Sequence, residues 1–125
     1  MTADEETKMH EEFGTTMITD FPELTSPFWN MSRNADGKTA KKIDVILGGM
    51  ETIGSAERSC DVDMMRDTFH SITDGAYSKL LFELFGKERV EAELEKFLEF
   101  DFFQRVGGGI GVTRMIPALE NINRI

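Results

Sequence analysis

Residues 42–53, KIDVILGGMETI, carry the pattern on which the predicted fold depends. Two apolar runs flank Gly48 and Gly49. A glycine pair between such runs is typical of a two-residue hairpin turn, because glycine adopts positive φ without strain. With the glycines at the centre of the turn, Ile46 pairs with Glu51. The sequence therefore predicts an antiparallel hairpin here.

Two acidic residues interrupt the apolar pattern of this hairpin. Asp44 shares a strand face with Ile46, and cross-strand pairing brings Glu51 to the same face, with the two acids about 7–8 Å apart at the backbone. Burying a carboxylate is costly without a partner. Two carboxylates with phosphate oxygens form a ligand set that Mg²⁺ accepts, so we expect Asp44 and Glu51 to bind Mg²⁺. The alternative is a surface hairpin with ordinary exposed ion pairs.

Arg58 lies seven residues after Glu51, so strict alternation would turn it to the opposite face. Gly54 and Ser55 suit a bulge, which inserts one residue and restores the facing. We therefore expect Arg58 to face the two acids and to bind a substrate carboxylate through its planar guanidinium. Ser55 is assigned to substrate binding with it.

A second pattern, GGGIGVTR from Gly107 to Arg114, places four glycines in five residues directly before a predicted helix. Glycine lets the backbone approach a flat ligand closely, and a helix N-terminus favours anions. Arg114 stands where a dinucleotide fingerprint has Gly, and no Gly-Lys-Ser/Thr of a P-loop is present. An arginine one turn into the helix can hold a terminal phosphate. The alternative is a flexible connector between strand and helix.

The rest of the chain predicts an α+β fold with an antiparallel sheet flanked by helices. Residues 1–14 form a polar lead-in, either helical or frayed, and residues 15–125 form the domain. Glycines 107–109 are expected to break an extended segment. The other expected elements are extended segments at 15–20, 27–31 and 102–106 and helices near 62–75, 77–86, 90–98 and 111–121.

Composition narrows the function classes. The formal net charge of −9 gives no support to a dedicated nucleic-acid-binding domain. The small basic cluster from Arg33 to Lys42 is expected to be a solvated loop. The single cysteine, Cys60, cannot form an internal disulfide, and no apolar run approaches membrane-spanning length, so we expect no membrane association and a cytoplasmic location.

Taken in order, Asp-x6-Glu-x6-Arg (residues 44, 51 and 58) and GGGIGxxR resemble the second half of the class II aspartyl- and asparaginyl-tRNA synthetase catalytic core, and the archaeal-type asparagine synthetase related to it. ITDFP (residues 18–22) and PFW (residues 27–29) resemble the strand and loop that precede the metal hairpin of that core. The resemblance spans roughly residues 15–120.

The resemblance implies a class II synthetase-like fold with ATP and Mg²⁺ as ligands. It implies that Asp44 and Glu51 bind the magnesium of ATP and that Arg58 holds the side-chain carboxylate of aspartate. Arg114 would hold the γ-phosphate. The nucleotide would also lie near Glu51, Gly108, Gly109 and Gly111.

The first and second signature motifs of that family have no counterpart in the chain. We therefore expect a homodimer or a companion chain that supplies an N-terminal half. The predicted function is an AMP-forming ligase that activates aspartate as aspartyl-adenylate and transfers it to ammonia. Two alternatives remain: an aspartyl- or asparaginyl-tRNA synthetase fragment, with tRNA as a less favoured partner, and a non-catalytic binding or assembly module.

Overall fold

The sheet is built from four antiparallel strands in the order β1-β2-β3-β4. The computed structural model describes residues 1–122; residues 123–125, the end of the predicted domain, lie outside the described part. The strands are β1 Thr16–Pro22, β2 Thr39–Leu47, β3 Met50–Arg58 and β4 Arg105–Ile110. The predicted α+β class with an antiparallel sheet is confirmed.

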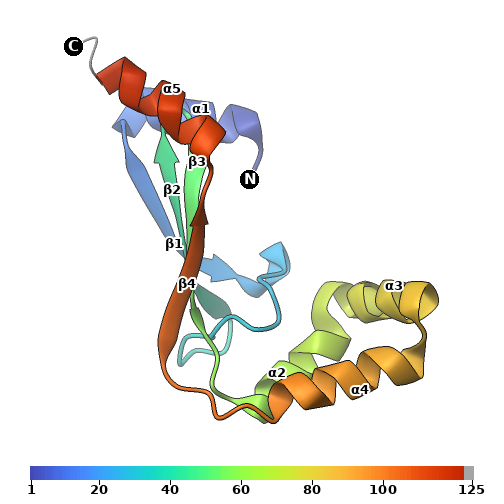
Figure 1. Ribbon diagram of the computed structural model, residues 1–125. Helices are drawn as coiled ribbons and strands as arrows, with labels where there is room; N and C mark the ends of the chain where they lie inside the picture. The colour runs from blue at the N-terminus through green and yellow to red at the C-terminus, as the bar shows by residue number, and fades with distance from the viewer. Residues whose placement is uncertain (123–125) are drawn as a thin grey trace.

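The helices gather at the two ends of the sheet (Figure 1). Helices α1 and α5 lie at the end that carries the β2–β3 turn, whereas α2, α3 and α4 form a cluster beyond the other end. Their bounds are α1 Ala3–Phe13, α2 Val62–Ser71, α3 Ala76–Phe85, α4 Lys87–Leu98 and α5 Val112–Ile122, with short 3-10 turns at Glu23–Thr25 and Ile72–Gly75. No helix within residues 1–122 is both long enough and apolar enough to cross a membrane.

The glycine turn forms as predicted. Gly48 and Gly49 have φ angles of 60° and 81°, which only glycine adopts freely at both positions of such a turn. Ile46 pairs with Glu51, as expected. Helix α1 and helix α5 both approach this turn: a Cβ on Gly49 would lie 3.8 Å from the Cα of Thr7, and one on Gly48 would lie 3.5 Å from the Cα of Ala118.

The predicted bulge is present but lies earlier in β3 than expected. Ile46 pairs with Glu51 and Val45 pairs with Ile53, so Thr52 is the extra residue. Thr52 is only 2% exposed, and its hydroxyl donates to the carbonyl of Met50 (3.1 Å). A buried hydroxyl that is hydrogen-bonded within the turn stabilises the bulge locally, so no glycine is needed there. The expectation that Gly54 and Ser55 form the bulge is wrong.

The three glycines 107–109 do not break a strand; they lie inside β4 and pair with residues 56–54 of β3. A Cβ on Gly108 would lie 2.6 Å from the carbonyl oxygen of Gly54. The glycines therefore permit a close approach of two backbones in the sheet. The predicted extended segment 27–31 is likewise irregular, apart from a single bridge between Met31 and Arg58.

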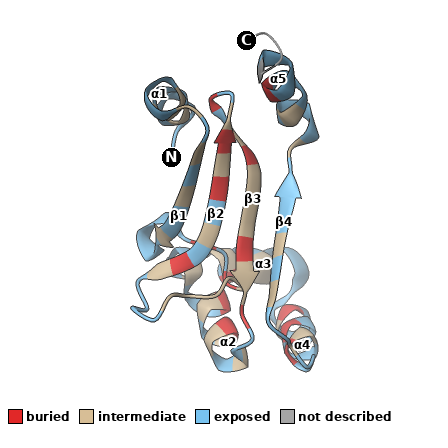
Figure 2. Ribbon diagram, turned by 90° about the vertical axis from the view of Figure 1, so that its left-hand side faces the viewer, coloured by how far each residue is buried: buried red, intermediate tan, exposed pale blue. Residues whose placement is uncertain are grey.

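The apolar core lies mainly in the helical cluster and the loop before β2. Trp29 packs there with its ring 5.4 Å from that of Phe69. The other buried core residues of the cluster are Met65, Val90, Leu94 and Leu98. The sheet's own buried residues lie on β2 and β3, its central strands (Figure 2). The three predicted central helices are confirmed, and Asp61 caps α2 by accepting from the amide of Met64 (3.0 Å).

The expected boundary between residues 14 and 15 falls in the turn that joins α1 to β1. Helix α1 nevertheless packs against the sheet, because Glu6 accepts a hydrogen bond from the backbone N–H of Glu51 (3.2 Å). The polar lead-in is therefore a docked helix. It begins with a capping box in which Thr2 and Glu5 bind each other's backbone N–H groups.

The helical cluster contains an ion pair with a predictable pH dependence. Arg66 of α2 donates two hydrogen bonds to Glu95 of α4 (2.6 and 3.0 Å), and these hydrogen bonds lower the pKa of Glu95 below its ordinary value of 4.5. We predict that Glu95→Gln destabilises the protein at about pH 7. The difference in stability between this variant and the unchanged protein should vanish as the pH falls through the lowered pKa of Glu95. Arg66 stabilises the folded state only while the Glu95 carboxylate is ionised.

Urea unfolding midpoints at about pH 7 and about pH 3 measure this effect. Glu83→Gln, on the exposed part of α3, removes the same charge without a hydrogen-bonded partner and is the control. An equal destabilisation by Glu95→Gln at both pH values would contradict the prediction.

Candidate functional site

Asp44 and Glu51 line one cleft of about 340 Å³. The acidic cleft, as we call it, is lined by these two carboxylates together with Glu6 of α1 and Lys42 of β2. The two carboxylates converge above Gly54: a Cβ at that position would lie 3.0 Å from Glu51 Oε1 and 3.5 Å from Asp44 Oδ1. Gly54 thus leaves room for both acids, which is a different role from the predicted bulge.

Asp44 has one oxygen satisfied and one free. Its side chain is buried, with the residue 3% exposed, and Oδ2 pairs with Lys42 Nζ at 2.8 Å. Oδ1 is buried and has no hydrogen-bond partner among residues 1–122. Such an oxygen is costly unless a donor or a cation binds it. The unpartnered oxygen and the nearby carboxylate of Glu51 fit a hard cation such as Mg²⁺. Residues 1–122 contain no cluster of three His, Cys, Asp or Glu side chains for a metal, so other ligands would be needed.

Lys42 is a site residue that the sequence did not predict, and Glu6 is another. Lys42 lies in β2 rather than in a solvated loop, with its ammonium 4.0 Å from the ring centroid of Phe21 and in contact with Asp44. Its spacing of two residues from Asp44 was the available signal, since such residues share a strand face. Arg33, at the other end of the expected loop, is also anchored: it pairs with Glu23 and donates to the carbonyl of Met31 (2.7 Å).

Arg58 lies on the same face of the sheet as the acids, because the bulge restores its facing. Its Nη1 is 3.5 Å from Asn30 Oδ1, and its Nε lies 3.0 Å from the position of a Cβ on Gly107. Gly107 pairs with Ala56, so the arginine side chain runs back along the strand towards the acids. Arg58 lies four positions after Gly54, which is about 13 Å along the strand.

This face contains a stretch of backbone with almost no side chains. Gly54 and Ala56 of β3 lie beside Gly109 and Gly107 of β4. Apart from its chain neighbours, no atom of the described residues lies within 4 Å of the position that a Cβ on Gly109 would take, so this part is open. We call these four residues the glycine floor. It is bounded by the two carboxylates at one end and by Arg58 at the other.

Arg114 lies beside Glu51. In the first turn of α5, it donates through Nη1 to the carbonyl oxygen of Glu51 (2.8 Å). Gly111 leads into this turn and donates its N–H to the carbonyl of Thr52 (2.8 Å). The structure therefore brings Arg114 to the backbone of Glu51, although Arg114 does not line the acidic cleft itself. Of the predicted nucleotide-contacting glycines, Gly109 lies on the face that carries the acids and Gly111 lies at the junction.

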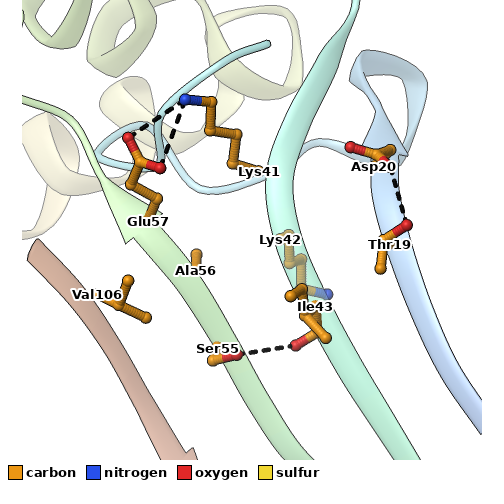
Figure 3. A pocket seen from close by; sticks show the side chains of 9 residues that line it. All are labelled: Thr19, Asp20, Lys41, Lys42, Ile43, Ser55, Ala56, Glu57 and Val106. Carbon is orange, nitrogen blue, oxygen red and sulfur yellow. Dashed lines mark hydrogen bonds and ion pairs between the residues drawn. The ribbon is translucent and has the colours of Figure 1, made fainter.

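Two residues assigned to the site point away from it. Gly108 pairs with Ser55, and both belong to the opposite face of the sheet. Figure 3 shows Ser55 there, donating to the carbonyl of Ile43 (3.3 Å) in a hollow of about 370 Å³. The hollow also holds the ion pair of Lys41 with Glu57 (3.3 Å). The structure does not bring Ser55 or Gly108 to the acidic cleft.

Residues 2–125 match the family described as tRNA synthetases class II (D, K and N). The chain belongs to this family. The expected resemblance to a class II synthetase core is thereby confirmed. A comparison with curated proteins finds no match.

Solved class II synthetases share the fold. Asparaginyl-tRNA synthetase from Pyrococcus horikoshii has a TM-score of 0.71 and 20% identity, covering 98% of this chain and 27% of that one. Aspartyl-tRNA synthetase from Entamoeba histolytica has a TM-score of 0.67 and 19% identity, and the match covers 98% of this chain and 24% of that one. The asparaginyl-tRNA synthetase of E. histolytica in complex with asparaginyl-adenylate has a TM-score of 0.72 and 16% identity, and the match covers 96% of this chain and 25% of that one. The chain thus spans about a quarter of each structure.

Gly54 offers a direct test of the paired carboxylates. We predict that Gly54→Ala lowers the affinity for Mn²⁺, used as a probe for Mg²⁺ with ATP present, by about tenfold. The new methyl group would displace Glu51 Oε1 from its place beside Asp44. Stability should change little, because the crowded atom ends a flexible side chain.

Electron paramagnetic resonance of free Mn²⁺ measures the affinity. Ser55→Ala, one residue away but on the opposite face, is the matched control and should bind Mn²⁺ normally. Equal affinities for the two variants would argue against a cation site at these acids.

Proposed function

We propose that this chain binds ATP and aspartate in an AMP-forming ligase that activates aspartate as aspartyl-adenylate, with ammonia as the acceptor. The observation that carries the proposal is the grouping of Asp44, Glu51 and Arg58 on one face, with Arg114 hydrogen-bonded to Glu51. Membership of a family of ATP-dependent synthetases supports the use of ATP.

Each residue has a role in the proposal. Asp44 and Glu51 hold Mg²⁺, which neutralises charge on the phosphates when it is bound. Arg114 leaves the carbonyl of Glu51 and binds the γ-phosphate. Gly109 provides an open strand surface for the flat base of ATP. Arg58 binds a carboxylate of aspartate through two parallel hydrogen bonds.

In the proposed reaction, a carboxylate oxygen of aspartate attacks the α-phosphorus of ATP, the bond to the bridging oxygen breaks, and pyrophosphate leaves. Ammonia then attacks the acyl carbon. AMP leaves with the electron pair of the acyl–oxygen bond, and the nitrogen gives up a proton. The product is asparagine only if the activated group is the side-chain carboxylate.

The choice of the activated carboxylate determines which carboxylate of aspartate Arg58 binds. If ammonia is the acceptor, Arg58 must hold the α-carboxylate, which revises the expectation drawn from the family resemblance. If tRNA is the acceptor, the α-carboxylate is activated and Arg58 holds the side-chain carboxylate. The aspartyl- and asparaginyl-tRNA synthetases among the similar structures favour this second candidate. The net charge of −9 and the pairing of Lys41 and Lys42 with acids favour ammonia over a polyanion.

Hydroxylamine trapping separates the two candidates. Incubated with ATP, Mg²⁺ and aspartate, the protein should convert hydroxylamine to β-aspartyl hydroxamate and release AMP, because hydroxylamine attacks whichever carboxylate is activated. Chromatography against both hydroxamate standards identifies the product. The α-hydroxamate would favour the tRNA synthetase reading. No hydroxamate and no AMP would contradict catalysis by this chain and favour a non-catalytic module.

Arg114 can be tested by binding alone. We predict that Arg114→Ala weakens Mg²⁺–ATP binding by about 10- to 100-fold, the loss expected for a charge-assisted contact, while AMP binding is unchanged. Isothermal titration calorimetry measures both ligands. Arg89→Ala removes an exposed arginine of α4 and is the control. Equal losses for ATP and AMP would contradict a specific γ-phosphate contact.

We also propose that a companion chain or a second copy covers the apolar surface opposite the acids. Val106 is 74% exposed on β4, and Met17 and Ile110 on the same face are also exposed. Helix α5 exposes Val112, Ile116 and Leu119 at helical spacing. Apolar patches of this kind are typical of interaction surfaces. A cytoplasmic location remains part of the proposal, and the free thiol of Cys60 is compatible with it.

A further inference from the structure

Helix α1 contributes a third carboxylate to the acidic cleft. The residues Glu6, Met9 and His10 are half-buried on the side of α1 that meets the hairpin, and their spacing is that of one helix face. A Cβ on Gly49 would lie 3.9 Å from the Cβ of His10, so the helix is docked on the turn. A carboxylate on the packed face of a helix is costly unless it has a partner.

The partner of Glu6 is the backbone of Glu51. Oε2 of Glu6 accepts the N–H of Glu51 at 3.2 Å, and Arg114 donates to the carbonyl of Glu51 at 2.8 Å. The backbone N–H and the carbonyl oxygen of Glu51 are thus both hydrogen-bonded to side chains from the two terminal helices, α1 and α5. Glu51 is the second residue after the glycine turn and directly precedes the bulged Thr52, so these two contacts restrain the backbone beside the bulge.

We infer that Glu6 is a positioning residue: it holds the backbone of Glu51 so that the Glu51 carboxylate stays beside Asp44, and thereby it sets the cation affinity of the site. This inference rests on the proposed function, in which Asp44 and Glu51 bind the cation of ATP. Glu6 acts through its hydrogen bond to the amide and makes no contact with the cation. Helix α1 is then part of the site rather than a lead-in to the domain.

Three variants separate a hydrogen bond from a charge. Glu6→Ala removes both. Glu6→Gln removes the charge but keeps a carbonyl oxygen that can accept from the Glu51 amide. Glu12→Ala removes a carboxylate from the exposed side of the same helix and is the control. Two measurements are made on each: Mn²⁺ affinity in the presence of ATP, and hydrogen exchange of the Glu51 amide by NMR with no nucleotide present.

For Glu6→Ala, we expect the Mn²⁺ affinity to fall about tenfold and the Glu51 amide to exchange about tenfold faster. Glu6→Gln should restore most of both values, and Glu12→Ala should match the unchanged protein. Equal losses for Glu6→Ala and Glu6→Gln would overturn the inference, because they would make the charge responsible. An unchanged amide and unchanged affinity in Glu6→Ala would overturn it too.

The two readouts keep the inference and the proposed function apart. If the unchanged protein binds no Mn²⁺ with ATP, the proposed function fails, and a role for Glu6 in cation binding fails with it. If it binds Mn²⁺ and Glu6→Ala loses only amide protection, the proposed function stands and the positioning role is overturned. Circular dichroism of Glu6→Ala checks that the fold is retained. Should that variant not fold, a tenfold loss of Mn²⁺ affinity in Glu6→Gln with the Glu51 amide still protected would overturn the inference.

Discussion

One extra residue in β3 determines which face every later side chain of that strand occupies. Without Thr52 out of register, Glu51 and Arg58 would point to opposite sides of the sheet, because side chains alternate strictly along a strand. Thr52 also supplies the carbonyl that accepts the N–H of Gly111, at the junction between β4 and α5. The bulge therefore sets the facing of Arg58 and anchors the segment that leads to Arg114.

Features that depend on neighbours in sequence could be predicted from the sequence. The Gly48–Gly49 turn follows from the conformational freedom of glycine, and the pairing of Ile46 with Glu51 follows from the turn. The central helices follow from apolar periodicity and from the Asp61 cap. The meeting of Asp44 and Glu51 on one surface was likewise expected from cross-strand pairing.

Features that depend on contacts between distant segments could not be predicted in the same way. Glycine in a strand suggests either a bulge or a close contact, and the sequence alone does not distinguish them. At Gly54 the close contact is with two carboxylates, and at Gly108 it is with the backbone of β3. The docking of Glu6 on Glu51 joins residues 45 positions apart, so no local periodicity could reveal it.

The glycine floor shows why the charged groups lie at its ends. Glycine in a strand weakens the sheet, since it loses more conformational entropy on folding and offers no side chain to pack. In this chain the loss is offset at the ends, where Gly54 admits two carboxylates and Gly107 admits the guanidinium of Arg58. Beside Gly54, at Gly109, the surface is open with respect to the described residues and carries no charge of its own. Opposite charges at the two ends of a surface with few side chains suit a ligand that is cation-bound at one end and anionic at the other. In the proposed function, the phosphates with their cation would lie at the acidic end and the free carboxylate of aspartate at the Arg58 end, whichever carboxylate of aspartate is activated.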